Sequence, residues 1–458
     1  MLALTFGLAK RPIFNYLGAQ MANPFVTTIF AADPSAHVFN NRVYVYVSYE
    51  EPGTNTYDSM QSYHCISSDD LQNWVDHGRI LSLKDVDWAI SHMWAIDGNY
   101  WQGKYYLVYC AIDKETSTFK TGLGVSDRPE GPFKDQGTIS GVEWGQDPSL
   151  YVWNETPYLV WGGRGAILIA ELNQDLKSVK PETIRDLSVD INGYEGPFLH
   201  EREGKFYLTY PALENEQWPQ RMSFATAETP LGPYKYGGVF IPEYEGNSGT
   251  IHGSIIEFKG EWYSFYHSGF ISGTATNRSL MLDRIQHDAE GNIIPFMPNR
   301  EGAFAGKGST VVILDAAAAP RASGKLHGTK IATDNSDYTG HGYVTGLVQQ
   351  EYGVSVLVDN GLEQEYEIFI RYRSEAQRVS RVVAGKQLFY DGNQNQDYDQ
   401  YINRGTVFPA SASWQELSVG RIVLKPGEHE IRISNSHNLP DGENGIEIDY
   451  VKLVPLFG

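Results

Sequence analysis

A hairpin-like segment recurs five times in the first two-thirds of the chain, and this repeat constrains the fold more than any other feature. In the fourth copy, a short apolar strand, a polar turn containing Gly204 and a strand of alternating side chains follow one another. This order indicates a β-hairpin. The copies recur about every 50–60 residues, a period that in strand-forming repeats indicates one propeller blade per copy. The sequence therefore predicts a five-bladed β-propeller, with the copies at 37–46, 99–109, 150–161, 194–210 and 255–266.

Each copy carries an acid or a histidine a few residues before its turn. A single Asp before Pro is common in turns, but turn formation is a weak explanation for an acid or a histidine at the corresponding point of all five copies. If the first strand of each hairpin lines the central channel, we expect all five side chains near one mouth of that channel. These residues are Asp33, Asp97, Asp147, Glu195 and His252.

The last third of the chain has a different pattern. A glycine-rich connector at 301–309 precedes short alternating strands separated by turns, which is typical of a β-sandwich. A chain of 458 residues also exceeds a usual single core. We therefore predict an all-β protein with a propeller at 23–305 and a jelly-roll β-sandwich at 310–458.

Charge and composition exclude several functions. The net charge of −20 argues against nucleic acid or an anionic membrane as partner, whereas a neutral polysaccharide is compatible with it. Two cysteines give no disulfide framework, and no run of about 20 apolar residues could span a membrane. We expect a secreted or periplasmic location, although residues 1–11 lack the basic start of a signal peptide.

The acids suit the hydrolysis of a glycosidic bond. That reaction needs a proton donor and, in inverting enzymes, a second carboxylate about 6.5–9.5 Å away that activates water. Asp33 and Glu195, from the first and fourth repeats, fit these roles, and Asp147 could raise the pKa of Glu195 by like-charge repulsion. Trp94 could stack on a sugar ring. The alternatives are that the acids only form turns, or that the propeller binds sugar without cleaving it.

Four motifs resemble those of glycoside hydrolase family 43, the five-bladed propeller glycosidases. Residues 32–39 resemble the family's base motif, 146–150 its modulator motif and 194–197 its acid motif. Residues 93–97 match a Trp-Ala-Pro-Asp signature, with Ile96 where Pro is usual. The resemblance implies inversion, with Asp33 as base, Asp147 as pKa modulator and Glu195 as acid. It also implies that Asp97 is a structural partner.

The resemblance extends to ligands and substrates. His252 matches a channel histidine that faces calcium or a water cluster in several members. Because Ca²⁺ prefers six to eight oxygen ligands, waters would have to complete such a site, and a structural histidine is the alternative. Arg278 could donate to sugar hydroxyls or form a surface salt bridge. No organic cofactor is expected. The closest resemblance is to β-xylosidases and α-L-arabinofuranosidases acting on xylan or arabinoxylan fragments. The alternative is an endo-arabinanase or a galactan-cleaving relative.

The C-terminal region resembles carbohydrate-binding modules of the family 6 and 35 type. Residues 342–347, 366–372 and 448–451 carry this likeness. Those modules begin with a Glu-Ala-Glu that helps to bind a structural Ca²⁺, and here Asp315 is followed by Ala317 where the second acid is expected. Tyr343 and Trp414 are candidates for sugar stacking, with a place in the core as the alternative for Trp414.

Overall fold

The computed structural model describes residues 23–54, 56–188, 190–304, 311–322, 324–385 and 402–456. Regular structure in these ranges consists of β-strands and short 3₁₀ turns, as the sequence predicts. None of the described segments forms a helix long and apolar enough to cross a membrane. The possible signal segment at 1–11 and the part of the connector after residue 304 lie outside the described residues.

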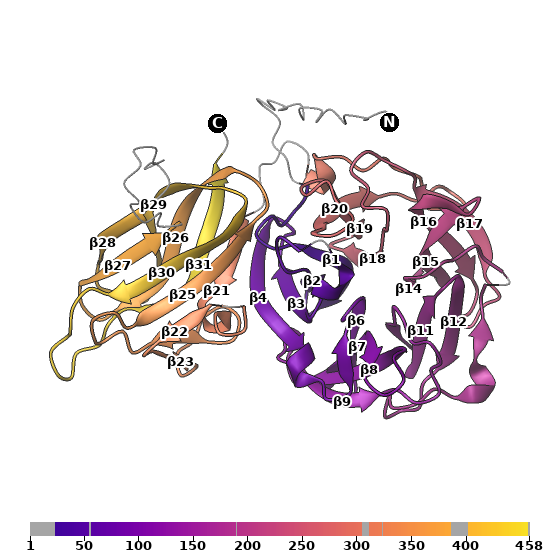
Figure 1. The fold of residues 1–458 in the computed structure, drawn as a ribbon, viewed down its shortest axis with the longest axis horizontal. Coiled ribbons are helices and arrows are strands. Elements are labelled where there is room, and N and C mark those ends of the chain that lie inside the picture. The colour runs from indigo at the N-terminus through magenta and orange to yellow at the C-terminus, as the bar shows by residue number, and fades with distance from the viewer. Residues whose placement is uncertain are drawn as a thin grey trace, which may run out of the picture.

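Residues 23–304 form five sheets arranged in a ring around a central axis (Figure 1). Within each sheet, paired neighbouring strands are antiparallel, and all but the fifth sheet contain four or five strands. The first sheet contains β1 (Ala31–Phe39), β2 (Arg42–Tyr49), β3 (Ser62–Ser68) and β4 (Asn73–Ser82). The second contains β5 (Ala89–Ser91), β6 (Ile96–Trp101), β7 (Lys104–Asp113), β8 (Phe119–Ser126) and β9 (Lys134–Thr138).

The remaining sheets complete the ring (Figure 1). The third contains β10 (Ser149–Trp153), β11 (Thr156–Gly163), β12 (Ala166–Glu171) and β13 (Arg185–Asp186). The fourth contains β14 (Phe198–Arg202), β15 (Lys205–Glu214), β16 (Gln217–Ala227) and β17 (Lys235–Ile241). The fifth contains β18 (Gly253–Phe258), β19 (Glu261–Ser268) and β20 (Ser279–Ile285).

The five predicted hairpins are all present, one in each sheet. Each has a two-residue turn in which both residues adopt positive φ, the conformation that matches the twist of the flanking strands. Asn and Gly tolerate this conformation well, which explains why the turns are recognisable from sequence. The turn pairs are Asn40 and Asn41, Gln102 and Gly103, Asn154 and Glu155, Glu203 and Gly204, and Lys259 and Gly260.

The start of the described chain lies against the last sheet of the ring. Val26 forms an antiparallel bridge with Leu280 of β20, and the Phe25 N–H donates to Leu280 O at 3.0 Å. The Asn23 side chain donates to Asp283 Oδ2 at 2.9 Å and accepts from the Leu282 N–H at 2.8 Å. These contacts join the first and fifth sheets through a segment just before β1.

Residues 311–456 form two sheets that enclose one apolar core (Figure 1). Isoleucine and valine dominate this core, as expected for strands buried on one face. One sheet contains β21 (Val311–Asp315), β23 (Lys330–Ala332), β24 (Tyr343–Thr345), β26 (Gln364–Ser374), β29 (Ser411–Leu424) and β31 (Glu447–Leu456). The other contains β22 (Lys325–His327), β25 (Gly353–Asn360), β27 (Arg378–Ala384), β28 (Ile402–Phe408) and β30 (Gly427–Asn435).

One strand joins the ring to the C-terminal sheets. β21 pairs in parallel with β4, so that Val311 to Leu314 lie opposite Asn73 to Asp76, and on its other side it pairs with β31. The first sheet of the ring therefore continues into a C-terminal sheet. A second contact runs through the β25–β26 loop, where the Gly361 N–H donates to Thr27 O at 2.9 Å. These contacts hold the two parts together without any need for the connector to be rigid.

Candidate active site

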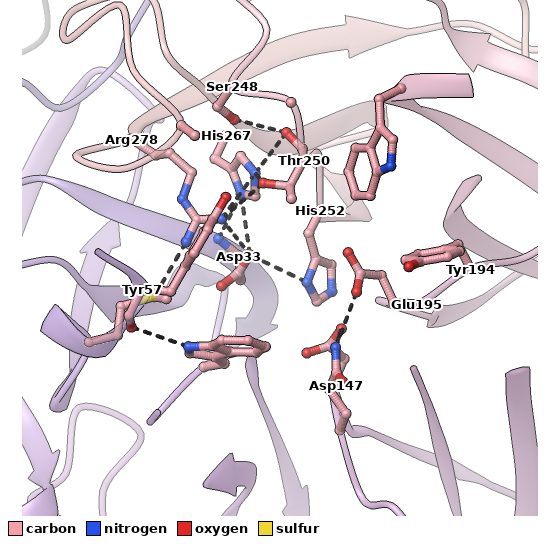
Figure 2. Close-up of a pocket in the computed structure, with 16 residues that line it drawn as sticks. Asp33, Tyr57, Asp147, Tyr194, Glu195, Ser248, Thr250, His252, His267 and Arg278 are labelled. Carbon is pink, nitrogen blue, oxygen red and sulfur yellow. Dashed lines mark hydrogen bonds and ion pairs between the residues drawn. The ribbon is translucent and has the colours of Figure 1, made fainter. Parts of the chain in front are cut away.

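A cavity of about 330 Å³ opens at the centre of the ring (Figure 2). Four of the five residues predicted to share one channel mouth line it, namely Asp33, Asp147, Glu195 and His252. Trp94 and Arg278, predicted to bind substrate, also line it. The cavity thus brings together residues from all five repeats.

Asp97 is the exception to the predicted common mouth. Its side chain is buried, does not line the cavity, and accepts hydrogen bonds from Ser149 Oγ at 2.8 Å and the Leu150 N–H at 2.7 Å. The other carboxylate oxygen lies 2.6 Å from His37 Nε2. The prediction was wrong for Asp97 because it lies five residues before its turn, two fewer than Asp33, Asp147 and His252, and its carboxylate bonds to the first and third sheets. The structural role implied for Asp97 by its motif agrees with these contacts.

Asp33 lies at an irregularity in β1 and is held in the ionised state. Its φ of 53° and the shift in pairing between Ala32 and Ser35 mark a bulge, which can re-aim a side chain. Burial alone would raise the pKa of Asp33. The Arg278 charge, with Nη1 at 3.6 Å from Oδ1, and the hydrogen bond from His252 outweigh burial and hold this pKa well below its usual range.

Two histidines flank Asp33, and their pKa values are shifted in opposite directions. Burial and the nearby Arg278 lower the pKa of His267 to about 4, so its ring is neutral. Its Nδ1 accepts a hydrogen bond from the Asp33 N–H at 3.0 Å. His252 has Nδ1 at 3.5 Å from Asp33 Oδ1. Burial would lower the pKa of His252, but the hydrogen bond and the charge of Asp33 raise it above its ordinary value. His252 therefore favours the protonated state.

Asp147 is a buried carboxyl that favours its neutral form. Burial is the main cause, and the Glu195 charge adds to it, raising the pKa of Asp147 to about 8. Its Oδ2 accepts the Gly196 N–H at 3.2 Å. Positive φ at Asp147, 46°, places it at a sharp bend directly before β10.

Glu195 is held by two glutamine side chains. Gln220 Nε2 donates to Oε1 at 2.6 Å, and Gln146 Nε2 donates to Oε2 at 3.1 Å. Burial raises the pKa of Glu195, and the hydrogen bond from Gln220 opposes this rise without cancelling it. Gln220 is itself anchored, because its Oε1 accepts the Ile251 N–H at 3.1 Å. The two amides therefore fix the orientation of the carboxyl group.

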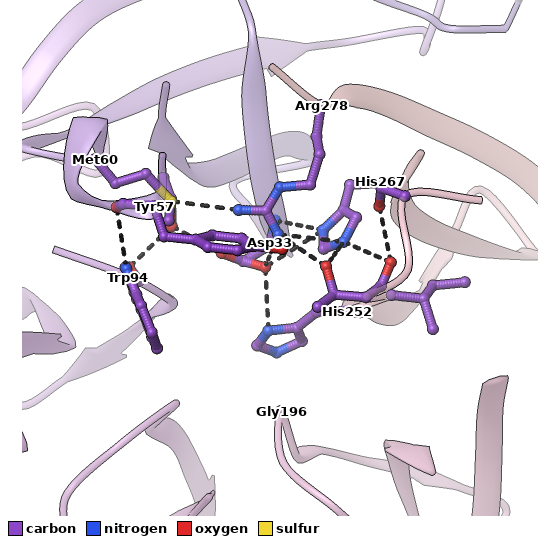
Figure 3. Close-up of polar contacts among 12 residues, drawn as sticks. Asp33, Tyr57, Met60, Trp94, Gly196, His252, His267 and Arg278 are labelled. Atoms are coloured by element: carbon purple, nitrogen blue, oxygen red, sulfur yellow. Dashed lines mark hydrogen bonds and ion pairs between the residues drawn. The ribbon is translucent and has the colours of Figure 1, made fainter. Parts of the chain in front are cut away.

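Gly196 allows the His252 ring to lie close to the backbone at position 196 (Figure 3). A Cβ at position 196 would lie 3.0 Å from the His252 ring and 2.9 Å from Pro211, and the φ of 54° is one that glycine adopts most easily. The glycine after the acid is therefore required both by the backbone and by the packing of His252.

Aromatic rings and a buried arginine form the rest of the wall. Trp94 is half-buried, and its Nε1 donates to Tyr57 O at 3.2 Å. Trp218 is 54% exposed at the rim and packs edge-to-face on Tyr194, with ring centroids 5.9 Å apart. Arg278 is buried and pairs with the buried Glu50 at 2.9 Å, so the predicted alternative of a surface salt bridge is wrong.

Sequence reasoning missed several residues of the site. Gln220, His267 and Glu50 carry no motif and lie far along the chain from their partners, so no local pattern marks them. Gln146 belongs to the Asp147 motif but was given no role. A search for polar residues within predicted strands could have found Gln220 in β16, but not its partner, and it would not have found Glu50, which lies just after the end of β2.

The two candidates for sugar stacking in the C-terminal part differ in exposure. Tyr343 is 1% exposed and does not present its ring for stacking. Trp414 is half-buried rather than in the core, and it packs edge-to-face on Tyr343 at 5.4 Å. The guanidinium carbons of Arg371 and Arg373 lie 5.6 Å and 5.4 Å from the Trp414 ring.

A cavity at the centre of a ring of sheets, with one carboxyl group whose pKa is lowered and two whose pKa values are raised, is typical of enzymes that cleave glycosidic bonds. The sequence pattern of glycosyl hydrolases family 43 matches residues 21–293. The chain belongs to this family and is a glycoside hydrolase.

Similar proteins cover the ring of sheets. Xylosidase/arabinosidase 43A from Humicola insolens is 31% identical over 60% of this chain and 99% of its own length. A xylosidase/arabinosidase from Bacteroides ovatus is 30% identical over 58% of this chain and 94% of its own. The crystal structure of a β-xylosidase/α-arabinofuranosidase from a compost metagenome, in complex with xylotriose and in a calcium-free form, is 30% identical. It covers 61% of this chain and 98% of its own, with a TM-score of 0.55.

One solved structure extends the fold similarity to nearly the whole chain. An arabinoxylan arabinofuranohydrolase from Bacillus subtilis covers 95% of this chain and 98% of its own, with a TM-score of 0.58 and 22% identity. At that identity the likeness concerns the fold alone. It places the ring and the C-terminal sheets together in one known architecture.

Proposed function

We propose that the protein is an inverting exo-glycosidase that releases xylose, L-arabinofuranose or both from xylan or arabinoxylan fragments. The observation that carries this proposal is that the pKa values of two carboxyl groups in one cavity are shifted in opposite directions. Arg278 and His252 keep Asp33 ionised, as a general base must be, whereas burial raises the pKa of Glu195, as a general acid requires. A propeller that only binds sugar would need no such contrast.

In the proposed reaction, Asp33 takes a proton from the attacking water while Glu195 gives one to the leaving glycosidic oxygen. Asp147 contacts the Gly196 N–H beside the acid, and ionisation of either Asp147 or Glu195 opposes ionisation of the other by like-charge repulsion. The buried Glu50 pairs with Arg278 and keeps that cation in place beside Asp33. Gln146 and Gln220 orient the acid.

We infer that the ring is a five-bladed β-propeller over residues 23–305 and that residues 310–458 form a jelly-roll β-sandwich. The five hairpin-led sheets and the single C-terminal core support this division. The resemblance of the C-terminal part to carbohydrate-binding modules stays a prediction, because of the two stacking candidates Tyr343 is buried and Trp414 is half-buried.

The size of the cavity supports exo action on a small sugar. About 330 Å³ lies at the lower end of the range for ligand pockets. Trp94 offers an aromatic surface inside it, and Trp218 with Tyr194 offers a second at the rim where a leaving sugar would lie. The relatives are named for xylosidase and arabinosidase activities, and one was solved with xylotriose. Endo action would need an open groove instead.

Calcium near His252 has little support from the residues there. His252 offers one nitrogen, which favours a proton because of Asp33, and the nearest carboxylate is already paired with Arg278. Ca²⁺ prefers six to eight oxygens. Because His252 supplies a single ring nitrogen, waters would have to provide most ligands of a calcium site here, as the sequence predicts, and the proposed steps use none.

The acid role is tested by Glu195→Gln with xylobiose or an arabinoxylan oligosaccharide as substrate. We expect kcat to fall by about 10²–10⁴-fold, because the leaving oxygen loses its proton donor, while binding persists. An aryl glycoside with an acidic leaving group should be affected less. Wild-type turnover of the unactivated substrate would refute the assignment.

The stereochemistry is tested by proton NMR of the first sugar released. Asp33 and Glu195 make no direct contact in the described structure, and different side chains hold them. This arrangement suits a base and an acid on opposite sides of the glycosidic bond. We expect inversion. Retention would mean that one carboxylate acts as nucleophile.

A further inference from the structure

A cluster of two histidines and an aspartate lies where the first sheet of the ring meets the C-terminal sheets. His77 comes from β4, Asp315 from the end of β21, and His341 from the segment before β24. One nitrogen or carboxylate oxygen from each lies within 4.8 Å of the other two. None of the three lines the cavity that holds Glu195.

The hydrogen bonds of His341 leave one ring nitrogen facing a carboxylate. Nε2 lies 3.1 Å from Gly131 O, and because a carbonyl can only accept, Nε2 carries a hydrogen. Nδ1 lies 3.1 Å from Asp315 Oδ2. In a neutral ring that nitrogen carries a lone pair, so two acceptors face each other. A proton or a metal ion between them removes this repulsion.

His77 distinguishes the two possibilities. Its Nε2 lies 2.6 Å from Ser67 Oγ, while its Nδ1 is buried and has no hydrogen-bond partner in the described structure. A proton shared by His341 and Asp315 would leave this nitrogen unpaired, and a buried unpaired nitrogen is costly. A metal ion would use all three side chains.

We propose that His77, Asp315 and His341 bind a divalent transition-metal ion that links the ring to the C-terminal sheets, with Zn²⁺ as the test ion. Two imidazoles and one carboxylate suit zinc, whereas Ca²⁺ prefers oxygen ligands. Bonds of 2.0–2.1 Å in a tetrahedral site place ligand atoms about 3.3 Å apart, close to the 3.1 Å between His341 Nδ1 and Asp315 Oδ2.

The surroundings of the cluster support this assignment. Gly131 O accepts a hydrogen bond from Nε2 of His341, and metal-bound histidines commonly donate their second ring N–H to a carbonyl or carboxylate in this way. Gly340 has φ of 66°, and a Cβ there would collide with Asp315 Oδ2 and come within 3.4 Å of His77 Nδ1. Arg128, which donates to Gly340 O, is paired with Glu130. The glycine thus keeps space between the ligands.

The test uses the full chain, freed of metal with a chelator and titrated with ZnCl₂ by calorimetry. We expect one ion per chain and, with excess zinc, a rise in Tm of about 2–4 °C, because the ion binds only the folded state. CoCl₂ should give the visible absorption bands of tetrahedral cobalt. No stoichiometric zinc binding by the wild-type chain would overturn the proposal.

Variants assign the ligands. His341→Gln and His77→Gln should each lose the zinc-dependent rise in Tm and the cobalt bands, whereas His437→Gln, at an exposed histidine of the C-terminal part, should keep both. Tm without metal shows whether each variant folds. If His77→Gln does not fold, His341→Gln and Asp315→Asn decide the question. Zinc binding by folded His341→Gln with wild-type affinity would refute the site.

Discussion

Gln220 offers a direct test of how the site sets the protonation of its proposed acid. The residue is fully buried, and its Nε2 lies 2.6 Å from Glu195 Oε1. A hydrogen bond to a charged group contributes about 1.5–3 kcal/mol, and one pKa unit corresponds to about 1.36 kcal/mol. In Gln220→Met the pKa of Glu195 should therefore rise by about 1–2 units.

The shift should appear in the pH profile of kcat/KM. The proposed acid must be protonated, so loss of activity at high pH reports its ionisation, or that of its coupled pair with Asp147. In Gln220→Met this alkaline limb should move up by about 1–2 pH units, while the acidic limb, set by Asp33, stays in place.

Two controls accompany this variant. Gln136→Met removes an exposed glutamine that only contacts nearby backbone carbonyls, and its profile should match the wild type. Gln220→Met also leaves the Ile251 N–H without its acceptor, so thermal unfolding must show that the variant is folded at the assay temperature. An alkaline limb that stays in place, or moves to lower pH, would refute the reasoning.

Three further predictions concern stability and packing. With the pKa of Asp147 at about 8 in the folded state and about 3.9 unfolded, the folded state binds more protons between these values, so wild-type stability falls as pH rises from about 4 to 8. Asp147→Asn should remove this fall in stability. The difference in Tm between the variant and the wild type should therefore increase with pH up to about pH 8. A difference in Tm that does not change with pH would contradict this prediction. Gly196→Ala should lower kcat/KM by roughly 10-fold or more, because the added methyl group displaces His252. The control Gly204→Ala, at a positive φ with open space around it, should lower stability but not kcat/KM. Equal effects of the two variants on kcat/KM would argue against the packing role of Gly196. Residues 1–308 alone should show a lower Tm or aggregate, because the edge of β4 loses its pairing with β21; a fragment that is folded but inactive would show that the C-terminal part contributes to the site.

Local patterns in the sequence predict most of the fold. Two-residue turns with residues that tolerate positive φ, flanked by alternating side chains, depend on neighbours along the chain, and all five hairpins are found where they were predicted. The acids and the histidine before the turns were predicted in the same way, and the four that line the cavity lie seven or eight residues before their turns. The position of Asp97 was not predicted correctly. This residue lies only five positions before its turn, and its carboxylate lies at the contact between sheets instead of in the cavity.

The sequence by itself determined the all-β class, the repeats and the candidate acids. Only the tertiary structure decided what surrounds those acids, because the partners lie far apart in the chain: Glu50 and Arg278 are separated by 228 positions, and Gln220 and Glu195 by 25. The same holds for the parallel pairing of β21 with β4 and for the cluster of His77, Asp315 and His341. Turn conformation and strand alternation depend on adjacent residues, whereas burial, charge and hydrogen bonding depend on distances in space, which no local pattern encodes.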